Sequence, residues 1–142
     1  MNNQILERAY RHCINNGYRF TLPRQHVLKI LLDHAKPMGA YDILQKFPST
    51  LGKQNPPTVY RAIKFWYQEG FIHCIDSLKA YIACCHGNHV GQSTFLICAQ
   101  CEYVKEFDNC IDFSLVKNSA DQISFQIKSY TVEVRGICKS CQ

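Results

Sequence analysis

Two C-x-x-C motifs constrain the fold of this chain more than any other feature: Cys98–Cys101 and Cys138–Cys141. Because two residues between cysteines let both sulfurs of a tight turn face one point, two such turns brought together form a tetrahedral thiolate site for zinc. The intervening segment 102–137 has room for one strand, one helix and one strand, which would return the chain to its start. The spacing therefore predicts a closed structural zinc site with no open position for catalysis.

Taken singly, a C-x-x-C motif can also be a redox pair. Redox motifs usually open a helix, whereas Cys98 to Cys101 lies between two predicted strands. The nine cysteines are an odd number, and no signal peptide or membrane-spanning run is present. We therefore expect a soluble cytoplasmic protein whose thiols bind metal or react rather than form disulfides. No role is predicted for three other cysteines, Cys13, Cys74 and Cys110.

Basic side chains are concentrated in the first part of the chain. Residues 1–84 carry eleven Lys and Arg against five Asp and Glu, a net charge of +6, whereas residues 85–142 carry five against six, a net charge of −1. This asymmetry is typical of a polyanion-binding module joined to a second, neutral module. Solvated surface lysine accounts for the charge equally well, so the distribution leaves both interpretations open.

The first 84 residues alternate apolar patterns with strong stop signals. Asn15-Asn16-Gly17 ends a first helical pattern, Thr21 and Pro23 begin a second, and Pro48 stops a third. Several helices followed by a hairpin predict a winged helix-turn-helix. The predicted elements are helices over 2–16, from 21 to about 36, from 40 to 47 and from 55 to 70, then strands Phe71–Ile75 and Ala80–Cys84 joined by Asp76-Ser77.

The helix predicted over 55–70 has one apolar face. Tyr60, Arg61 and Lys64 lie off that face, where Arg can bind a guanine edge, Tyr can contact a thymine methyl or a phosphate, and Lys can neutralise phosphate. A merely solvated helix face would show the same periodicity, so the pattern is compatible with both. The apolar positions recur at i, i+3, i+4 and i+7 and are Val59, Ala62, Ile63 and Trp66.

A polar, glycine-containing stretch, residues 85–92, is predicted to be a hinge or linker. We therefore expect an α+β chain in three parts. A winged helix-turn-helix domain spans 1–84, the hinge follows, and a small α/β domain with the four-cysteine zinc site spans 93–142. The elements predicted in this last part are strands Thr94–Ile97, Glu102–Phe107 and Phe125–Val134 and a helix over about Asp112–Asp121.

A second group of metal-ligand side chains is drawn from both hairpin strands, the linker and the second half, so a metal bound there would bridge the two halves. Mixed nitrogen, sulfur and oxygen ligands suit zinc, and a thiolate argues against a hard ion such as magnesium. The alternative is that the histidines are surface residues and the cysteines core residues. The group is His73, Cys84, His89 and Glu106, with Cys85 and His86 as competitors.

Several kinds of catalytic site have recognisable local sequence patterns. The chain has no nucleophile elbow, no phosphate-cradling glycine loop and no His-Glu-x-x-His helix. We therefore expect neither an enzyme nor a protein with a small-molecule substrate.

Five sequence motifs occur along this chain in the same order as in a known protein family. They are Arg19-Phe20-Thr21-Leu22-Pro23-Arg24, Ala40-Tyr41-Asp42, Pro57-Thr58-Val59-Tyr60-Arg61-Ala62, Gln68-Glu69-Gly70-Phe71-Ile72-His73 and the paired C-x-x-C motifs. Together they resemble the ferric uptake regulator superfamily, in particular its zinc-uptake repressor branch, over nearly the whole chain. The resemblance implies a homodimer that binds a pseudo-palindromic operator in double-stranded DNA near metal-uptake genes, with metal as corepressor.

The resemblance also implies roles for individual residues and makes the C-terminal domain the dimerisation domain. Two zinc sites would give about two zinc ions per protomer. Structural zinc would be bound by Cys98, Cys101, Cys138 and Cys141, and regulatory zinc by His73, Cys84, His89 and Glu106. By resemblance, Tyr60 and Arg61 would be base or phosphate readers and Tyr41 a backbone contact, and we also expect Thr58 and Lys64 to contact DNA.

Departures from the family pattern bear on which metal is sensed. The iron-sensing and peroxide-sensing relatives typically have a His-rich cluster with Asp near the linker, whereas this chain has Cys84-Cys85-His86-Gly87-Asn88-His89. The thiolate favours zinc. Because the spacing between Cys84 and Cys98 also differs, His86 can replace His89 as a ligand. The alternatives are a sister regulator that senses iron, manganese or peroxide, and a C-x-x-C thiol oxidoreductase.

Overall fold

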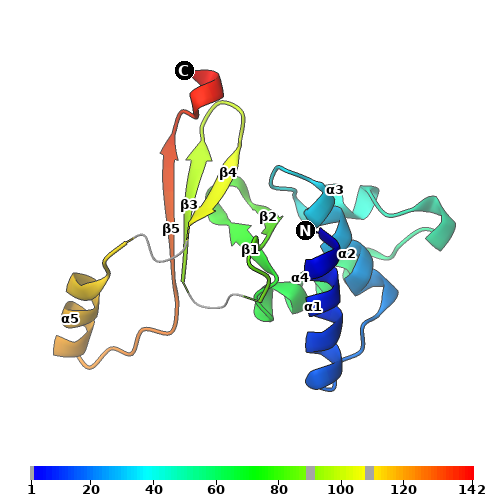
Figure 1. Cartoon of the computed structure of the whole chain (residues 1–142), viewed down its shortest axis with the longest axis horizontal. Helices are drawn as coiled ribbons and strands as arrows, with labels where there is room; N and C mark the ends of the chain where they lie inside the picture. Colours follow the sequence, from blue (N-terminus) through cyan, green and yellow to red (C-terminus); the bar gives the residue numbers. More distant parts are fainter. Residues whose placement is uncertain (1, 89–91, 108–110) are drawn as a thin grey trace. The chain divides into compact units, whose positions relative to one another are not determined.

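The computed structural model describes residues 2–88, 92–107 and 111–142. The chain forms two compact units, a first unit, Met1–His89, and a second unit, Val90–Gln142. Within the described ranges, the first unit contains four α-helices and a β-hairpin, and the second contains a three-stranded sheet and one α-helix (Figure 1). This content confirms the predicted α+β class. None of the helices in these ranges has the length and apolar character that crossing a membrane requires.

The helices of the first unit begin and end at the signals that the sequence contains. Thr21 and Asn55 are the N-cap residues of α2 and α4, and prolines occupy their first turns. Gly70 closes α4, because its φ of +74° lets the N–H groups of Gly70 and Phe71 bond back to the last turn. The elements are α1 (Asn2–Asn15), α2 (Leu22–Asp33), α3 (Ala40–Gln45), α4 (Pro56–Gln68), β1 (Ile72–Ile75) and β2 (Ala80–Ala83).

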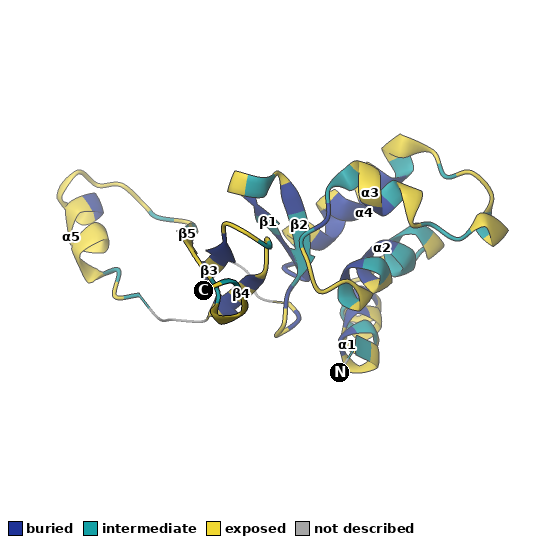
Figure 2. Ribbon diagram, turned by 90° about the horizontal axis from the view of Figure 1, so that it is seen from above, coloured by how far each residue is buried: buried dark blue, intermediate teal, exposed yellow. Residues whose placement is uncertain are grey.

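Aromatic side chains fill the core of the first unit. Trp66 on α4 is fully buried, and its ring meets that of Phe71 edge-on with centroids 5.2 Å apart. Its indole Nε1–H donates a hydrogen bond to the carbonyl oxygen of Arg24 at 2.7 Å, so the one polar group of this large side chain is satisfied inside the core. The predicted apolar stripe of α4 is buried, as the dark blue face of that helix shows (Figure 2).

The second unit is a sheet with the strand order β4-β3-β5. Its central strand pairs antiparallel with β4 and parallel with β5. A parallel neighbour requires a crossover, and the segment that contains the helix provides it. The elements are β3 (Gln92–Cys98), β4 (Val104–Phe107), α5 (Ser114–Gln122) and β5 (Tyr130–Gly136), and a 3-10 turn, Lys139–Cys141, ends the unit.

The strand predicted over Phe125–Val134 is wrong at its start, since β5 begins at Tyr130 and runs to Gly136. The reason lies at the end of α5. Ser124 has a φ of +55°, and its N–H and that of Phe125 bond back to carbonyl oxygens of the helix at 3.1 and 2.8 Å. These two bonds close the helix, so the N–H of Phe125 is used there and not in a sheet.

Candidate metal centres and nucleic-acid interface

Parallel pairing of β3 with β5 brings the two C-x-x-C motifs to the same end of the sheet. Cys98, the last residue of β3, lies opposite Gly136, which ends β5, and the second motif follows directly. The first motif turns back at once, since the N–H of Glu102 bonds to the carbonyl oxygen of Cys98 at 3.0 Å. The Sγ atoms that lie within 4.8 Å of one another in this four-cysteine cluster are those of Cys98, Cys101, Cys138 and Cys141.

The thiols of the four-cysteine cluster influence one another's ionisation. Backbone N–H groups, that of Cys138 first, point at the sulfur of Cys98 and lower the pKa of its thiol to about 6. The side chains of Cys138 and Cys101 raise the pKa of the Cys141 thiol to about 12. The first thiolate forms readily but the last is in conflict with it, because hydrogen bonds with the neighbouring cysteine side chains hold the proton on the Cys141 sulfur. A soft dication deprotonates coordinating thiols and removes this conflict, so the donor set fits tetrahedral zinc.

Part of the second predicted metal group lies on the hairpin of the first unit. His73 on β1 pairs with Ile82, and the N–H of Cys84 bonds to the carbonyl oxygen of Phe71 at 2.9 Å just beyond β2. A ring nitrogen of His73 and the Sγ of Cys84 lie within 4.8 Å of each other, and both residues are buried. A soft-ligand pair is therefore formed within the first unit.

The remaining candidates for that group come from the second unit and from the segment after β2. Glu106 lies on β4 of the second unit, and His89 lies outside the described residues. Cys85 and His86, the competitors, are exposed, and the Sγ of Cys85 lies 3.2 Å from Nδ1 of His86. The choice of the full ligand set stays a prediction.

The face of α4 opposite its apolar stripe is open to solvent. Tyr60 is 53% exposed, and Arg61 and Lys64 beside it are exposed too. Thr58 is half-buried on the first turn, and Tyr41 on α3 is 67% exposed. The predicted readers can therefore reach a ligand, and Arg, Lys and Tyr are side chains suited to phosphates and base edges.

Sequence reasoning did not single out Tyr67, which extends this exposed face of α4. It lines a cavity of about 400 Å³ between α4 and the hairpin, together with Tyr60 and Lys64 of α4 and with Tyr81 of β2. Burial raises the pKa of the Tyr81 hydroxyl. The i, i+4, i+7 spacing of Tyr60, Lys64 and Tyr67 is the signal that could have identified Tyr67.

Comparison with known proteins finds relatives along almost the whole chain. The model of the ferric uptake regulator family matches residues 15–135. The zinc uptake regulation protein of Escherichia coli (strain K12) is 28% identical over 141 residues, which cover 97% of this chain and 81% of that protein.

Two solved structures are similar in fold. One, described as a zinc uptake regulator complexed with zinc and DNA, has a TM-score of 0.90 at 27% sequence identity and covers 99% of this chain and 95% of that one. The crystal structure of holo XcZur has a TM-score of 0.86 at 34% identity and covers 99% and 98%. With its family model, its relatives and its fold in agreement, the chain belongs to the ferric uptake regulator family.

Proposed function

We propose that this protein is a zinc-responsive repressor of zinc-uptake genes that binds operator DNA as a homodimer, with zinc as corepressor. The observation that carries the proposal is the similarity, over 99% of the chain, to a zinc uptake regulator complexed with zinc and DNA. The four-cysteine cluster and the exposed basic face of α4 support it from the chain's own residues. In this proposal residues 1–84 read DNA, 85–92 form the hinge and 93–142 hold the dimer.

The proposal includes two metal sites with different roles, one structural and one regulatory, which together bind about two zinc ions per protomer. The four-cysteine cluster would hold a structural zinc and so stabilise the second unit. The regulatory site would draw its ligands from both units, starting from the neighbouring imidazole and thiol of His73 and Cys84. When bound, zinc supplies a rigid tetrahedral cross-link and no catalysis. The proposed regulatory ligands are His73, Cys84, His89 and Glu106.

DNA recognition would use the exposed face of α4. We assign Tyr60 and Arg61 to base edges or phosphates, and Thr58, Lys64 and Tyr41 to the backbone, according to their exposure and chemistry. Regulatory ligands from both units restrict how each winged helix is oriented. Two recognition helices held in register match successive major grooves about 34 Å apart, so less orientational entropy is lost on binding than when both domains move freely.

The first test is a zinc titration of operator binding, measured by fluorescence anisotropy of labelled DNA with the whole chain. We expect operator affinity to rise with zinc and Cys84→Ser to abolish the response. Cys74→Ser is the matched control. Cys74 follows the candidate ligand His73 on β1, and adjacent side chains of a strand point to opposite faces, so the Cys74 side chain lies on the other face of the hairpin. A zinc response that survives Cys84→Ser would refute the regulatory assignment.

The same titration separates the rival functions. An operator affinity that rose with iron or manganese but not with zinc would assign the protein to a sister branch of the family. Reduction of insulin disulfides by the purified protein would favour a thiol oxidoreductase instead.

The second test concerns the DNA-reading face. Arg61→Ala should weaken specific operator binding by about 1–3 kcal/mol, because a bidentate contact to a base edge is lost. Arg11→Ala, which removes an exposed guanidinium on α1, is the control for charge. Equal operator affinity for these two variants would remove Arg61 from the readers.

A further inference from the structure

The chain leaves the winged helix through residues 84–88, which we call the exit segment. It follows β2 directly and contains three of the soft ligands discussed above: Cys84, Cys85 and His86. Any restraint on this segment therefore bears on the position of candidate regulatory ligands. The first unit supplies such a restraint from a helix with no assigned function, α1.

One face of α1 contacts the exit segment at three consecutive points. Arg8 Nη1 donates a hydrogen bond to the carbonyl oxygen of His86 at 2.8 Å. Gly87 is buried with a φ of +62°, and a Cβ placed on it would lie 3.5 Å from Ile5 Cγ2. The side-chain nitrogen of Asn88 lies 3.4 Å from Nδ1 of His12. Ile5, Arg8 and His12 recur at helical spacing, so they form one continuous contact face.

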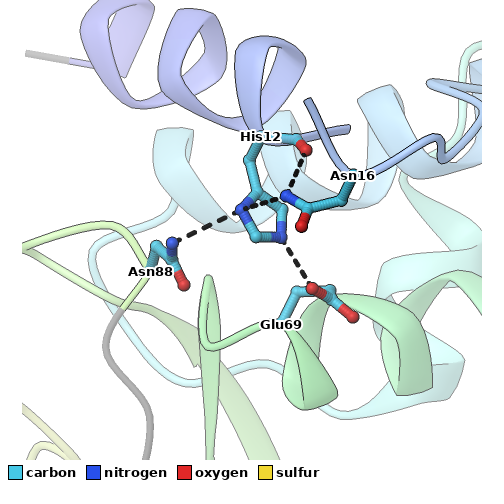
Figure 3. A network of polar contacts seen from close by, with 4 residues as sticks. All are labelled: His12, Asn16, Glu69 and Asn88. Atoms are coloured by element: carbon cyan, nitrogen blue, oxygen red, sulfur yellow. Dashed lines mark hydrogen bonds and ion pairs between the residues drawn. The ribbon is translucent and has the colours of Figure 1, made fainter. Parts of the chain in front are cut away.

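His12 joins this contact to the end of α4 (Figure 3). Its Nε2 lies 2.6 Å from Oε2 of Glu69, and because a carboxylate only accepts, Nε2 carries the proton. Nδ1 then accepts from the side-chain amides of Asn16 and Asn88, each at 3.4 Å. The imidazole thus uses both nitrogens, one toward α4 and one toward the exit segment.

The position of Glu69 explains why this pair forms. Glu69 is the C-cap residue of α4, where the helix dipole presents partial negative charge and a carboxylate is unfavourable without a partner. His12 is that partner, and its ring also packs on Phe71 with centroids 5.4 Å apart. The carbonyl oxygen of Phe71 accepts the N–H of Cys84 at 2.9 Å. The contacts therefore form a closed loop through α1, the end of α4 and the exit segment.

We propose that Arg8 and His12 are positioning residues that hold the exit segment in one conformation and so couple the regulatory ligands to the recognition helix α4. This inference rests on the proposed function. A segment already held against α1 loses less conformational freedom when its side chains bind a metal, so the metal binds more tightly. The loop through Glu69 ties that held segment to the end of the helix that reads DNA.

The test compares two arginines on the same helix. Arg8→Ala removes the bond to the exit segment, whereas Arg11→Ala removes an equally charged side chain that pairs with Glu7 on the helix surface. Both variants lose one positive charge, so the general attraction to DNA changes equally. His12→Leu tests the second contact, and the fluorescence of Trp66, the single tryptophan of the chain, reports whether each variant's first unit is folded.

Two measurements are made on each variant. Hydrogen exchange of the exit-segment amides in the zinc-free protein should be about three to ten times faster in Arg8→Ala and His12→Leu, the effect of losing one ordinary hydrogen bond. The zinc concentration for half-maximal operator binding should rise about threefold or more for the same reason. Arg11→Ala should match the unmodified protein in both measurements.

The outcomes separate this inference from the proposed function. If the unmodified protein responds to zinc and Arg8→Ala matches Arg11→Ala in exchange and in zinc response, the positioning role is refuted while the function stands. If exchange accelerates but the zinc response is unchanged, the coupling to the regulatory ligands is refuted. An unmodified protein whose operator binding ignores zinc refutes the proposed function itself.

Discussion

The first and second units differ in how far their apolar side chains are buried. In the first, Trp66 and Phe71 are fully buried in a cluster that reaches α1, α2, α3 and α4. In the second, Phe95 on the central strand is buried, but Leu115 on α5 and Phe125 just after it are 78% and 61% exposed, and α5 is mostly yellow (Figure 2). Apolar burial therefore stabilises the first unit far more than the second.

The contrast teaches how a small unit with a thin core can be stable. Burial contributes roughly 25 cal/mol per Å² of apolar surface, so exposed side chains such as Leu115 and Ile123 contribute little within one chain. A unit of this size needs a cross-link or a partner. Zinc bound by the four-cysteine cluster would supply the first, and a second copy of the chain would supply the second, since exposed apolar patches mark interaction surfaces.

The largest expected effect is on the second unit. Cys101→Ser should destabilise it by several kcal/mol, because zinc binding to a small domain contributes on the order of 10 kcal/mol and loss of one thiolate removes much of that. Circular dichroism during heating should show the second unit unfolding early, while the fluorescence of Trp66 reports the first unit alone. Coincident loss of both signals would show that the two units unfold together and would break the comparison.

The next effect is on the core of the first unit. Leu28→Ala should cost about 2–5 kcal/mol of unfolding free energy, because Leu28 is fully buried on α2 and its truncation leaves a cavity. Leu22→Ala on the same helix is the matched control, since Leu22 is 55% exposed and should change stability by less than about 0.5 kcal/mol. Urea denaturation followed by Trp66 fluorescence measures both. Similar costs would mean that burial is not what stabilises this unit.

The smallest expected change in unfolding free energy comes from a surface ion pair of the first unit. Lys29→Ala breaks an exposed i, i+4 ion pair with Asp33 and should cost only about 0.3–0.5 kcal/mol in the same urea experiment. The hydrogen bond from Lys29 lowers the pKa of Asp33 below its ordinary value of 3.8. The contribution of this ion pair to the free energy of unfolding is therefore present above pH 3.8 and is lost as the pH falls through the lowered pKa. A Lys29→Ala effect as large as that of Leu28→Ala would contradict the dominance of the core.

Local features of this chain were predictable because they depend on neighbours in the sequence. Pro23, Asn55 and Gly70 mark helix ends through backbone preferences that each residue carries anywhere, and α4 buries the stripe that its period-3.6 pattern predicts. The strand predicted from Phe125 was wrong because β-propensity says nothing about which carbonyl an N–H finds, and here closure of α5 uses it.

The candidate sites also combine features that the sequence supplies with features that only the tertiary structure decides. By itself, the sequence determined the paired C-x-x-C motifs and supplied the candidate ligand and DNA-contacting side chains, since these follow from the chemical properties of the residues. The tertiary structure decided that parallel β3 and β5 bring the motifs to one end of a sheet, and that His12 meets Glu69 across 57 positions of chain. Contacts between distant residues depend on how whole elements pack, and no local pattern specifies that packing.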